Sequence, residues 1–126
     1  EFLWSATARR QNQLDYTSIH LSDGDIRPCK VVRNLGVLID SQLSFAHHVN
    51  TITSKSYSEL RRLKSFRRSL PLHAARTLVN SLVVSTIDYC NCLLAGAPAK
   101  ITDKLQSVMN AAAKIVCGLK KYNHIT

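Results

Sequence analysis

The amino-acid sequence predicts an α+β fold, in which a small antiparallel sheet precedes three helices. Apolar residues recur at alternate positions in the first third of the chain and at every third or fourth position afterwards. The charge changes at the same place. Five basic and five acidic side chains cancel in residues 1–43, so residues 44–126 hold the whole net charge of +9. We therefore expect two parts, residues 1–43 and residues 44–126.

The first part has two segments with the pattern of strands. Polar and apolar residues alternate over residues 16–21. Residues 22–25 (SDGD) follow and are typical of a tight turn, because Asp and Gly tolerate positive φ angles. Residues 31–32 and the apolar run 35–39 come next. These segments predict a small antiparallel sheet with a hairpin that contains residues 35–39.

Three amphipathic segments follow, centred near residues 56, 80 and 108. Ser44 is a suitable N-cap for the first, Pro71 suits the first turn of the second, and Gly118 suits the C-cap of the third. The expected apolar stripes are, in order, Phe45, Val49, Ile52, Leu60 and Leu63; Leu72, Ala75, Leu78, Val79, Leu82, Thr86, Tyr89, Cys90 and Leu93; and Ile101, Leu105, Val108, Met109, Ala112, Ile115, Val116 and Leu119. Val84 and Ile87 lie opposite the second stripe, so the second helix is expected to be buried on both sides.

Groups that catalyse reactions or bind metals are sparse in the sequence. Cys90 and Cys92 lack the two-residue gap of zinc knuckles, so the cysteines are expected to be small buried apolar residues. Only one of His47 and His48 can face a core. The carboxylates are not clustered as two-metal nucleotidyl transfer requires. We expect no catalytic, cofactor-binding or metal-binding residue here, and no small-molecule substrate.

A run of basic residues is the strongest functional signal. On a helical wheel, Arg61, Lys64 and Arg68 share one flank of the first helix, while Arg67 falls on the line of its apolar stripe. Lys55 lies on the opposite flank, where it can pair with Glu59. Such a run is either a solvated helix face or a phosphate-binding surface, and the scarcity of nearby acids favours phosphate binding. The candidate nucleic-acid-binding residues are Lys55, Arg61, Arg62, Lys64, Arg67 and Arg68.

Short sequence phrases across the chain resemble one protein family. They include residues 32–40 (VRNLGVLID), 60–63 (LRRL), 88–91 (DYCN) and 105–108 (LQSV). In this order and spacing they resemble the region after the catalytic palm in reverse transcriptases of non-LTR (LINE-type, jockey-like) retrotransposons. Both ends of the chain stop inside such phrases, so the resemblance implies a fragment of a longer open reading frame.

The resemblance implies roles for both parts. Residues 1–43 would be the end of the palm and a primer-grip segment, in which Asn34, Leu35 and Gly36 position the primer terminus. A glycine there lets a nucleic-acid backbone approach closely. Residues 44–126 would be a thumb-like helical bundle that holds the template–primer duplex through its phosphates.

The resemblance also sets limits. The aspartate motifs of the palm are not in this sequence, so we expect no polymerase activity from this chain alone; the parent polymerase would hold Mg²⁺ in that palm. The implied partners are the RNA template, the RNA–DNA template–primer duplex, and the palm and fingers of the parent enzyme. A nuclear or cytoplasmic ribonucleoprotein is implied. No apolar run approaches the roughly 18 residues of a membrane span, and no signal-peptide pattern predicts secretion.

A second hypothesis belongs to another class of protein. The chain could be a non-catalytic helical module that binds a protein partner through the apolar surface left by the missing palm. Salt separates the two hypotheses, because phosphate binding weakens steeply with added salt and apolar association does not.

Overall fold

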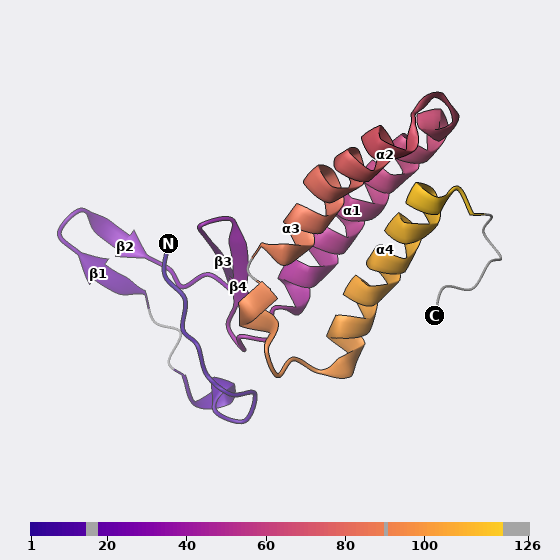
Figure 1. Cartoon of the computed structure of the whole chain (residues 1–126). Helices are drawn as coiled ribbons and strands as arrows, with labels where there is room; N and C mark the ends of the chain where they lie inside the picture. The colour runs from indigo at the N-terminus through magenta and orange to yellow at the C-terminus, as the bar shows by residue number, and fades with distance from the viewer. Residues whose placement is uncertain (15–17, 90, 120–126) are drawn as a thin grey trace. The chain divides into compact units, whose positions relative to one another are not determined.

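The computed structural model describes residues 1–14, 18–89 and 91–119, and it shows two small antiparallel sheets followed by helices (Figure 1). The predicted α+β fold is confirmed. The chain divides into two compact units, Glu1–His48 and Val49–Thr126, and the division falls in the first turn of helix α1 (Ala46–Phe66).

The strands of the first unit form two separate hairpins. Strand β1 (Ile19–Leu21) pairs with β2 (Gly24–Ile26), and β3 (Val31–Asn34) pairs with β4 (Val37–Asp40). The single sheet that we expected is therefore wrong. Pro28 lies between the hairpins and lacks the N–H that a continuous ladder requires, so pairing stops there. Residues 16–17, the expected start of the first strand, lie outside the described residues. A short 3₁₀ turn, η1 (Gln11–Gln13), precedes the hairpins.

Both hairpins close with tight two-residue turns. Residues 22–23 connect β1 and β2, and Gly24 has a φ of +136° at the end of that turn. Residues 35–36 connect β3 and β4, so the predicted hairpin that contains residues 35–39 is confirmed. Leu35 and Gly36 both have positive φ angles, as the turns favoured in two-residue hairpins require.

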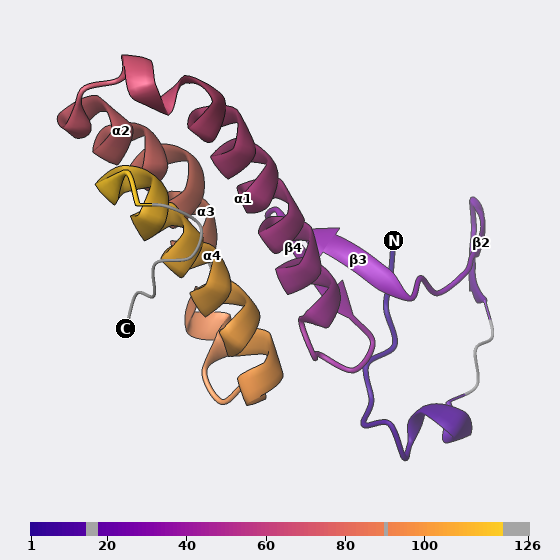
Figure 2. The ribbon, with the colours of Figure 1, turned by 90° about the vertical axis from the view of Figure 1, so that its right-hand side faces the viewer.

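The second unit is an up-down-up arrangement of three helical segments that lie side by side in both views (Figures 1 and 2). Helix α1 is followed by a 3₁₀ turn, η2 (Arg67–Ser69). The second segment contains α2 (Leu72–Val79), a π-helical turn, η3 (Asn80–Val84), and α3 (Ser85–Asp88); η4 (Asn91–Leu94) then leads to α4 (Ala99–Cys117). The three predicted helical segments are confirmed. Within the described residues, no helix combines the length and the apolar character needed to cross a membrane.

The core of this unit takes one valine from each helical segment. Val49, Val83 and Val108 are each at most 1% exposed. Between α1 and α4, the Nζ of Lys104 donates to the Oδ1 of Asn50 at 2.5 Å. Most of the predicted stripes of the first and third helices are confirmed, because the other buried apolar residues of α1 and α4 are Ile52, Leu60, Leu63, Ile101, Leu105 and Ala112. Leu119, the last residue of the third stripe, lies beyond the end of α4 and is exposed, so its place in the stripe is wrong.

The predicted stripe of the second helix is partly wrong. Its buried residues are spaced four apart along the segment, whereas the predicted stripe mixed steps of one, three and four residues. The π turn explains this difference, because each N–H there bonds to a carbonyl five residues back and the chain winds more slowly. The segment is not buried on both sides. The buried set is Ala75, Val79, Val83 and Ile87, and the exposed members of the predicted stripe are Leu72, Leu82, Tyr89 and Leu93.

The predictions for the cysteines and histidines had different outcomes. Cys92 and Cys117 are exposed, so the expectation that they are buried is wrong. Both lie where the chain leaves the bundle, in η4 and at the end of α4. Cys29 is half-buried, and Cys90 lies outside the described residues. His48 is 6% exposed while His47 is exposed, which confirms that only one of the pair faces inward.

Candidate functional site

A groove runs between the second half of α1 and the second half of α4. It encloses about 420 Å³. Its lining combines apolar residues with two exposed cations of α1, Arg61 and Lys64, and with half-buried Lys114 of α4. The described lining residues are Tyr57, Leu60, Arg61, Lys64, Ser107, Asn110, Ala111, Lys114, Ile115 and Leu119.

A second hollow of about 550 Å³ continues this groove toward the end of α1. It shares Lys64, Lys114, Ile115 and Leu119 with the first hollow and adds Arg67 and Arg68. None of the described residues that line either hollow is acidic. We call the two hollows together the basic groove; its cations are Arg61, Lys64, Arg67, Arg68 and Lys114.

Arg67 is held by the end of α4. Its Nε donates to the carbonyl of Ile115 at 2.8 Å, and its terminal nitrogens donate to the carbonyls of Val116 and Leu70 at 2.9 and 3.0 Å. Three of its five N–H groups are therefore used by main-chain oxygens. A cation at this place also opposes the negative end of the α4 dipole. Arg67 falls on the line of the apolar stripe because its side chain contacts the end of α4 across the bundle.

The same helix end has the predicted glycine cap. Gly118 adopts φ +67°, ψ 22°, the left-handed conformation that glycine reaches without strain. Its N–H donates to the carbonyl of Ile115, and the N–H of Leu119 donates to the carbonyl of Lys114 at 2.9 Å, a Schellman arrangement. The prediction of Gly118 as C-cap is confirmed. Arg67 and this cap together satisfy the last carbonyls of α4.

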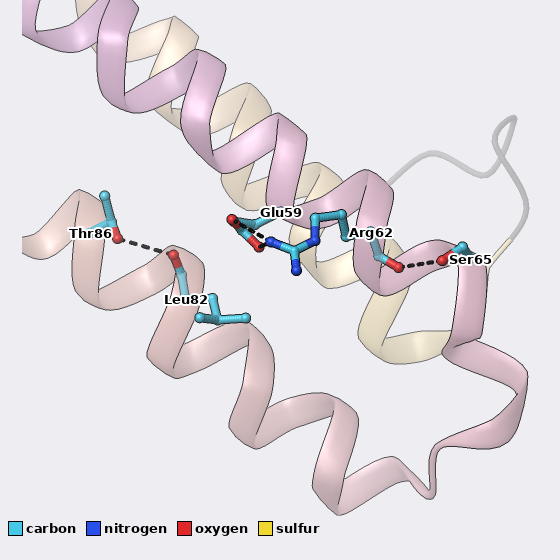
Figure 3. Close-up of polar contacts among 5 residues, drawn as sticks. All are labelled: Glu59, Arg62, Ser65, Leu82 and Thr86. Carbon is cyan, nitrogen blue, oxygen red and sulfur yellow. Dashed lines mark hydrogen bonds and ion pairs between the residues drawn. The ribbon is translucent and has the colours of Figure 1, made fainter.

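Arg62 and Lys55 do not line the basic groove. Arg62 pairs with Glu59 through contacts of 3.3 Å to both carboxylate oxygens, and its carbonyl accepts the hydroxyl of Ser65 (Figure 3). Glu59 is thus engaged by Arg62, three residues on, rather than by Lys55 as the sequence suggested. Figure 3 also shows the hydroxyl of Thr86 donating to the carbonyl of Leu82 on the neighbouring segment. Lys55 is exposed.

Lys114 was not predicted as a candidate binding residue from the sequence. The periodicity of α4 identifies its buried face but not which neighbouring helix each flank meets. One signal was present, because Lys114 is the only charged residue in residues 105–117. A lone cation in an otherwise uncharged helical stretch is a candidate for a specific contact.

In the first unit, the three residues assigned to a primer grip lie at the tip of the β3–β4 hairpin. Asn34 ends β3, and Leu35 and Gly36 form the turn with φ angles of 48° and 86°. Leu35 is 84% exposed. A leucine in the left-handed region costs of order 1 kcal/mol or more, and strained exposed residues of this kind cluster at functional sites.

The base of this hairpin is fixed by Asp40. Its carboxylate accepts the backbone N–H groups of Gln42 and Ser44 at 3.0 and 2.9 Å and the hydroxyl of Ser44 at 2.9 Å. Burial raises the pKa of Asp40, but hydrogen bonds from Ser44, Gln42 and Phe45 outweigh that effect, so the pKa lies below its usual value. Ser44 in turn accepts the N–H of Ala46 at 3.3 Å, which supports its predicted role at the start of α1.

His48 holds the other side of the hairpin. The N–H of Leu38 in β4 donates to the Nδ1 of His48 at 3.3 Å. This hydrogen bond requires Nδ1 to be unprotonated. Burial of the ring lowers the pKa of His48 below 6.5.

We expect the first unit to lose stability as the pH falls below about 6.5. In the unfolded chain His48 takes up a proton near that pH, whereas in the folded chain it does so only at a lower pH. The unfolded state therefore binds more protons, and the loss continues down through the lowered pKa of the folded state. Urea unfolding followed by Trp4 fluorescence at about pH 7.5 and pH 5 measures this change. His48→Asn keeps an acceptor near the Nδ1 position without titrating, so equal pH dependence in that variant would contradict the prediction.

Among the described residues, no three His, Cys, Asp or Glu side chains gather as a metal site would require. The arrangement of the basic groove suits a different chemistry, the binding of an extended anion through several cations. Neither the family models, nor the curated proteins, nor the solved structures compared with this chain match it.

Proposed function

We propose that this chain grips the phosphate backbone of a nucleic-acid duplex and serves as the primer-grip and thumb part of a retrotransposon RNA-directed DNA polymerase. The observation that carries the proposal is the basic groove. Its described lining includes five cations and no carboxylate, so no described side chain of the groove repels an anion. The family assignment rests on the sequence phrases described above.

The chemistry of the groove favours a polyanion over a single anion. Arg61 and Lys64 are one turn apart on α1, and Arg68 follows within the next turn, so their charges are spread along the groove. Leu60, Ala111 and Ile115 give the same groove apolar lining. Sugars present such apolar surface between successive phosphates. Contacts to phosphates fix position and are independent of sequence.

The exposed hairpin tip supports a second point of contact. Gly36 has no side chain to keep a nucleic-acid backbone away, and Leu35 offers an exposed apolar side chain beside it. A primer terminus held at this tip would be positioned by the backbone of residues 34–36. We propose a binding role for this chain and no catalytic step.

The test compares two triple variants that remove the same charge. The first replaces Arg61, Lys64 and Arg68 with alanine, all exposed in the groove. The second replaces Arg10, Arg76 and Lys100 with alanine, all exposed outside it. For an RNA–DNA hybrid of mixed sequence, we expect the first variant to lower the slope of log affinity against log salt by roughly 2–3 units, near 0.9 per lost phosphate contact.

The second variant is the matched control for the loss of charge. It should retain most of the salt slope, because its cations lie outside the groove. Equal losses in both variants would mean that the association is diffuse and that the groove is not the site. Circular dichroism of both variants verifies that each is folded.

One observation favours the alternative of a protein-interaction module. Large apolar side chains are exposed along the segment from α2 to η4, namely Leu72, Leu82, Tyr89 and Leu93. Residues of this kind mark protein interfaces when they are contiguous. Binding that persists at high salt and is lost on Leu82→Ser with Tyr89→Ser would support this module in place of phosphate binding.

A further inference from the structure

The first unit encloses a hollow that the proposed function does not use. It measures about 710 Å³, within the range of small-molecule pockets. The residues that line it come from five places in the sequence: the N-terminal segment, η1, the residue before β1, the stretch between β2 and β3, and the residue after β4. They include Trp4, Gln11, Arg27, Lys30 and Ser41.

The indole of Trp4 is held in place and partly open to solvent. The carbonyl of Phe2 accepts the N–H of Cys29 at 2.9 Å, and the N–H of Ala6 donates to the carbonyl of Ser41 at 3.0 Å, so the backbone is fixed on both sides of Trp4. The rings of Phe2 and Trp4 meet edge to face, with centroids 5.9 Å apart and planes at 87°. Trp4 nevertheless remains 40% exposed. A positioned, accessible aromatic ring is a platform on which another planar ring can stack.

Two cations lie on the same hollow. Arg27 and Lys30 are exposed and flank Pro28 and Cys29, and the fixed φ of proline stiffens the connection between them. None of the described residues that line the hollow is acidic. An anionic group is therefore favoured within reach of Trp4.

Polar groups of the hollow are oriented in advance. The Nε2 of Gln11 donates to the Oγ of Ser41 at 2.7 Å, and the Oε1 of Gln11 accepts the Nε2 of Gln42 at 3.2 Å. The amide of Gln11 is thus fixed from both ends. Its second N–H and the hydroxyl proton of Ser41 remain available as donors.

We propose that this hollow binds one nucleotide unit, with the base stacked on Trp4 and the phosphate held by Arg27 and Lys30. A purely apolar ligand would gain nothing from the two cations, and a bare phosphate would gain nothing from the indole. A nucleotide uses both, and its base and ribose present acceptors for Gln11 and Ser41. The proposal goes beyond the phosphate grip of the second unit, because it concerns a different unit and a single-stranded or free nucleotide.

The experiment uses the full chain, whose only tryptophan is Trp4. Indole fluorescence therefore reports on this hollow directly. We expect saturable quenching by AMP, and binding roughly tenfold weaker for adenosine and for ribose 5-phosphate, because each loses either the charged contacts or the stack. A short single-stranded RNA shows whether the bound nucleotide belongs to a nucleic-acid strand or is free. Affinity at least tenfold above that of AMP assigns a nucleic-acid strand, and equal affinity assigns a free nucleotide.

Substitutions inside and outside the hollow test whether AMP binds there. Arg27→Ala with Lys30→Ala should weaken AMP binding by roughly tenfold or more, since hydrogen bonds to charged groups are lost. Arg9→Ala with Arg33→Ala removes the same charge from exposed positions outside the hollow and should leave the affinity within about twofold. In calorimetry, Trp4→Leu should lower the affinity for AMP because the stacking contact is lost, and Trp4→Phe should restore much of that affinity.

The proposal is overturned if AMP, adenosine and ribose 5-phosphate bind alike, or if the Arg27 and Lys30 variant keeps full affinity while folded. Its failure is separable from that of the proposed function. The Arg61, Lys64 and Arg68 variant should bind AMP normally, and the Arg27 and Lys30 variant should keep the salt slope of the basic groove.

Discussion

Arg67→Ala is expected to lower the free energy of unfolding of the helical unit by about 2–3 kcal/mol. The substitution removes three charge-assisted hydrogen bonds, and one such bond contributes roughly 1.5–3 kcal/mol net. Because Arg67 is only half-buried, water can replace part of these contacts and the loss stays below the sum of the three. The carbonyls of Leu70 and Val116 lose this donor, whereas the carbonyl of Ile115 keeps the N–H of Gly118. Urea unfolding followed by far-ultraviolet circular dichroism measures the change, because the long helices belong to this unit.

Two companion variants separate the fork of Arg67 from its charge. Arg67→Lys keeps the charge but not the planar fork, so it should recover less than half of the loss. Arg68→Ala removes an exposed neighbour from the same 3₁₀ turn and should change stability by no more than about 0.5 kcal/mol. Equal effects at the two positions would show that Arg67 acts only through its charge.

Leu60→Ala is expected to cost about 3 kcal/mol. Leu60 is 2% exposed, and truncation of a buried leucine removes its transfer free energy and leaves a cavity, with measured costs of about 2–5 kcal/mol. The same unfolding assay measures this loss. Leu60→Met conserves volume and should cost less than about 1.5 kcal/mol. A loss below about 1 kcal/mol for the alanine variant would mean that α1 and α4 close over the missing side chain.

The Leu60 variant also tests the basic groove. Leu60 lines that groove, but its truncation leaves every cation in place. At a temperature where the variant is folded, its salt slope should equal that of the parent chain. A reduced slope would show that lost stability, and not lost charge, explains weaker binding.

The sequence predicted the helical unit well because its signals are local. The stripes of α1 and α4 repeat every three or four residues, and Gly118 can adopt the left-handed cap conformation that ends α4. The first unit was predicted less well. Its strands have three or four residues, too few for a period to show which strands pair, so two separate hairpins were predicted as one sheet.

The candidate site was only partly predictable. A helical wheel placed Arg61 and Lys64 on one flank, and both line the groove. The wheel could not show that Arg67 would reach the end of α4, because that contact joins residues 48 and 49 positions apart. The same limit hid Lys114, whose relation to α1 exists only in the folded bundle. The hollow around Trp4 was missed for the same reason, since it gathers residues from distant segments.

The π turn at Asn80–Val84 has an evolutionary consequence. A π turn is an α-helix into which one residue has been inserted, and the surplus residue is accommodated as a bulge. Deletion of one residue from this turn would restore regular α-helical bonding and rotate everything after it by about 100° relative to α2. Val83 and Ile87 would then leave the core. In an alignment with homologous chains, a one-residue gap at this place would therefore mark members whose second helical segment presents a different face to its neighbours.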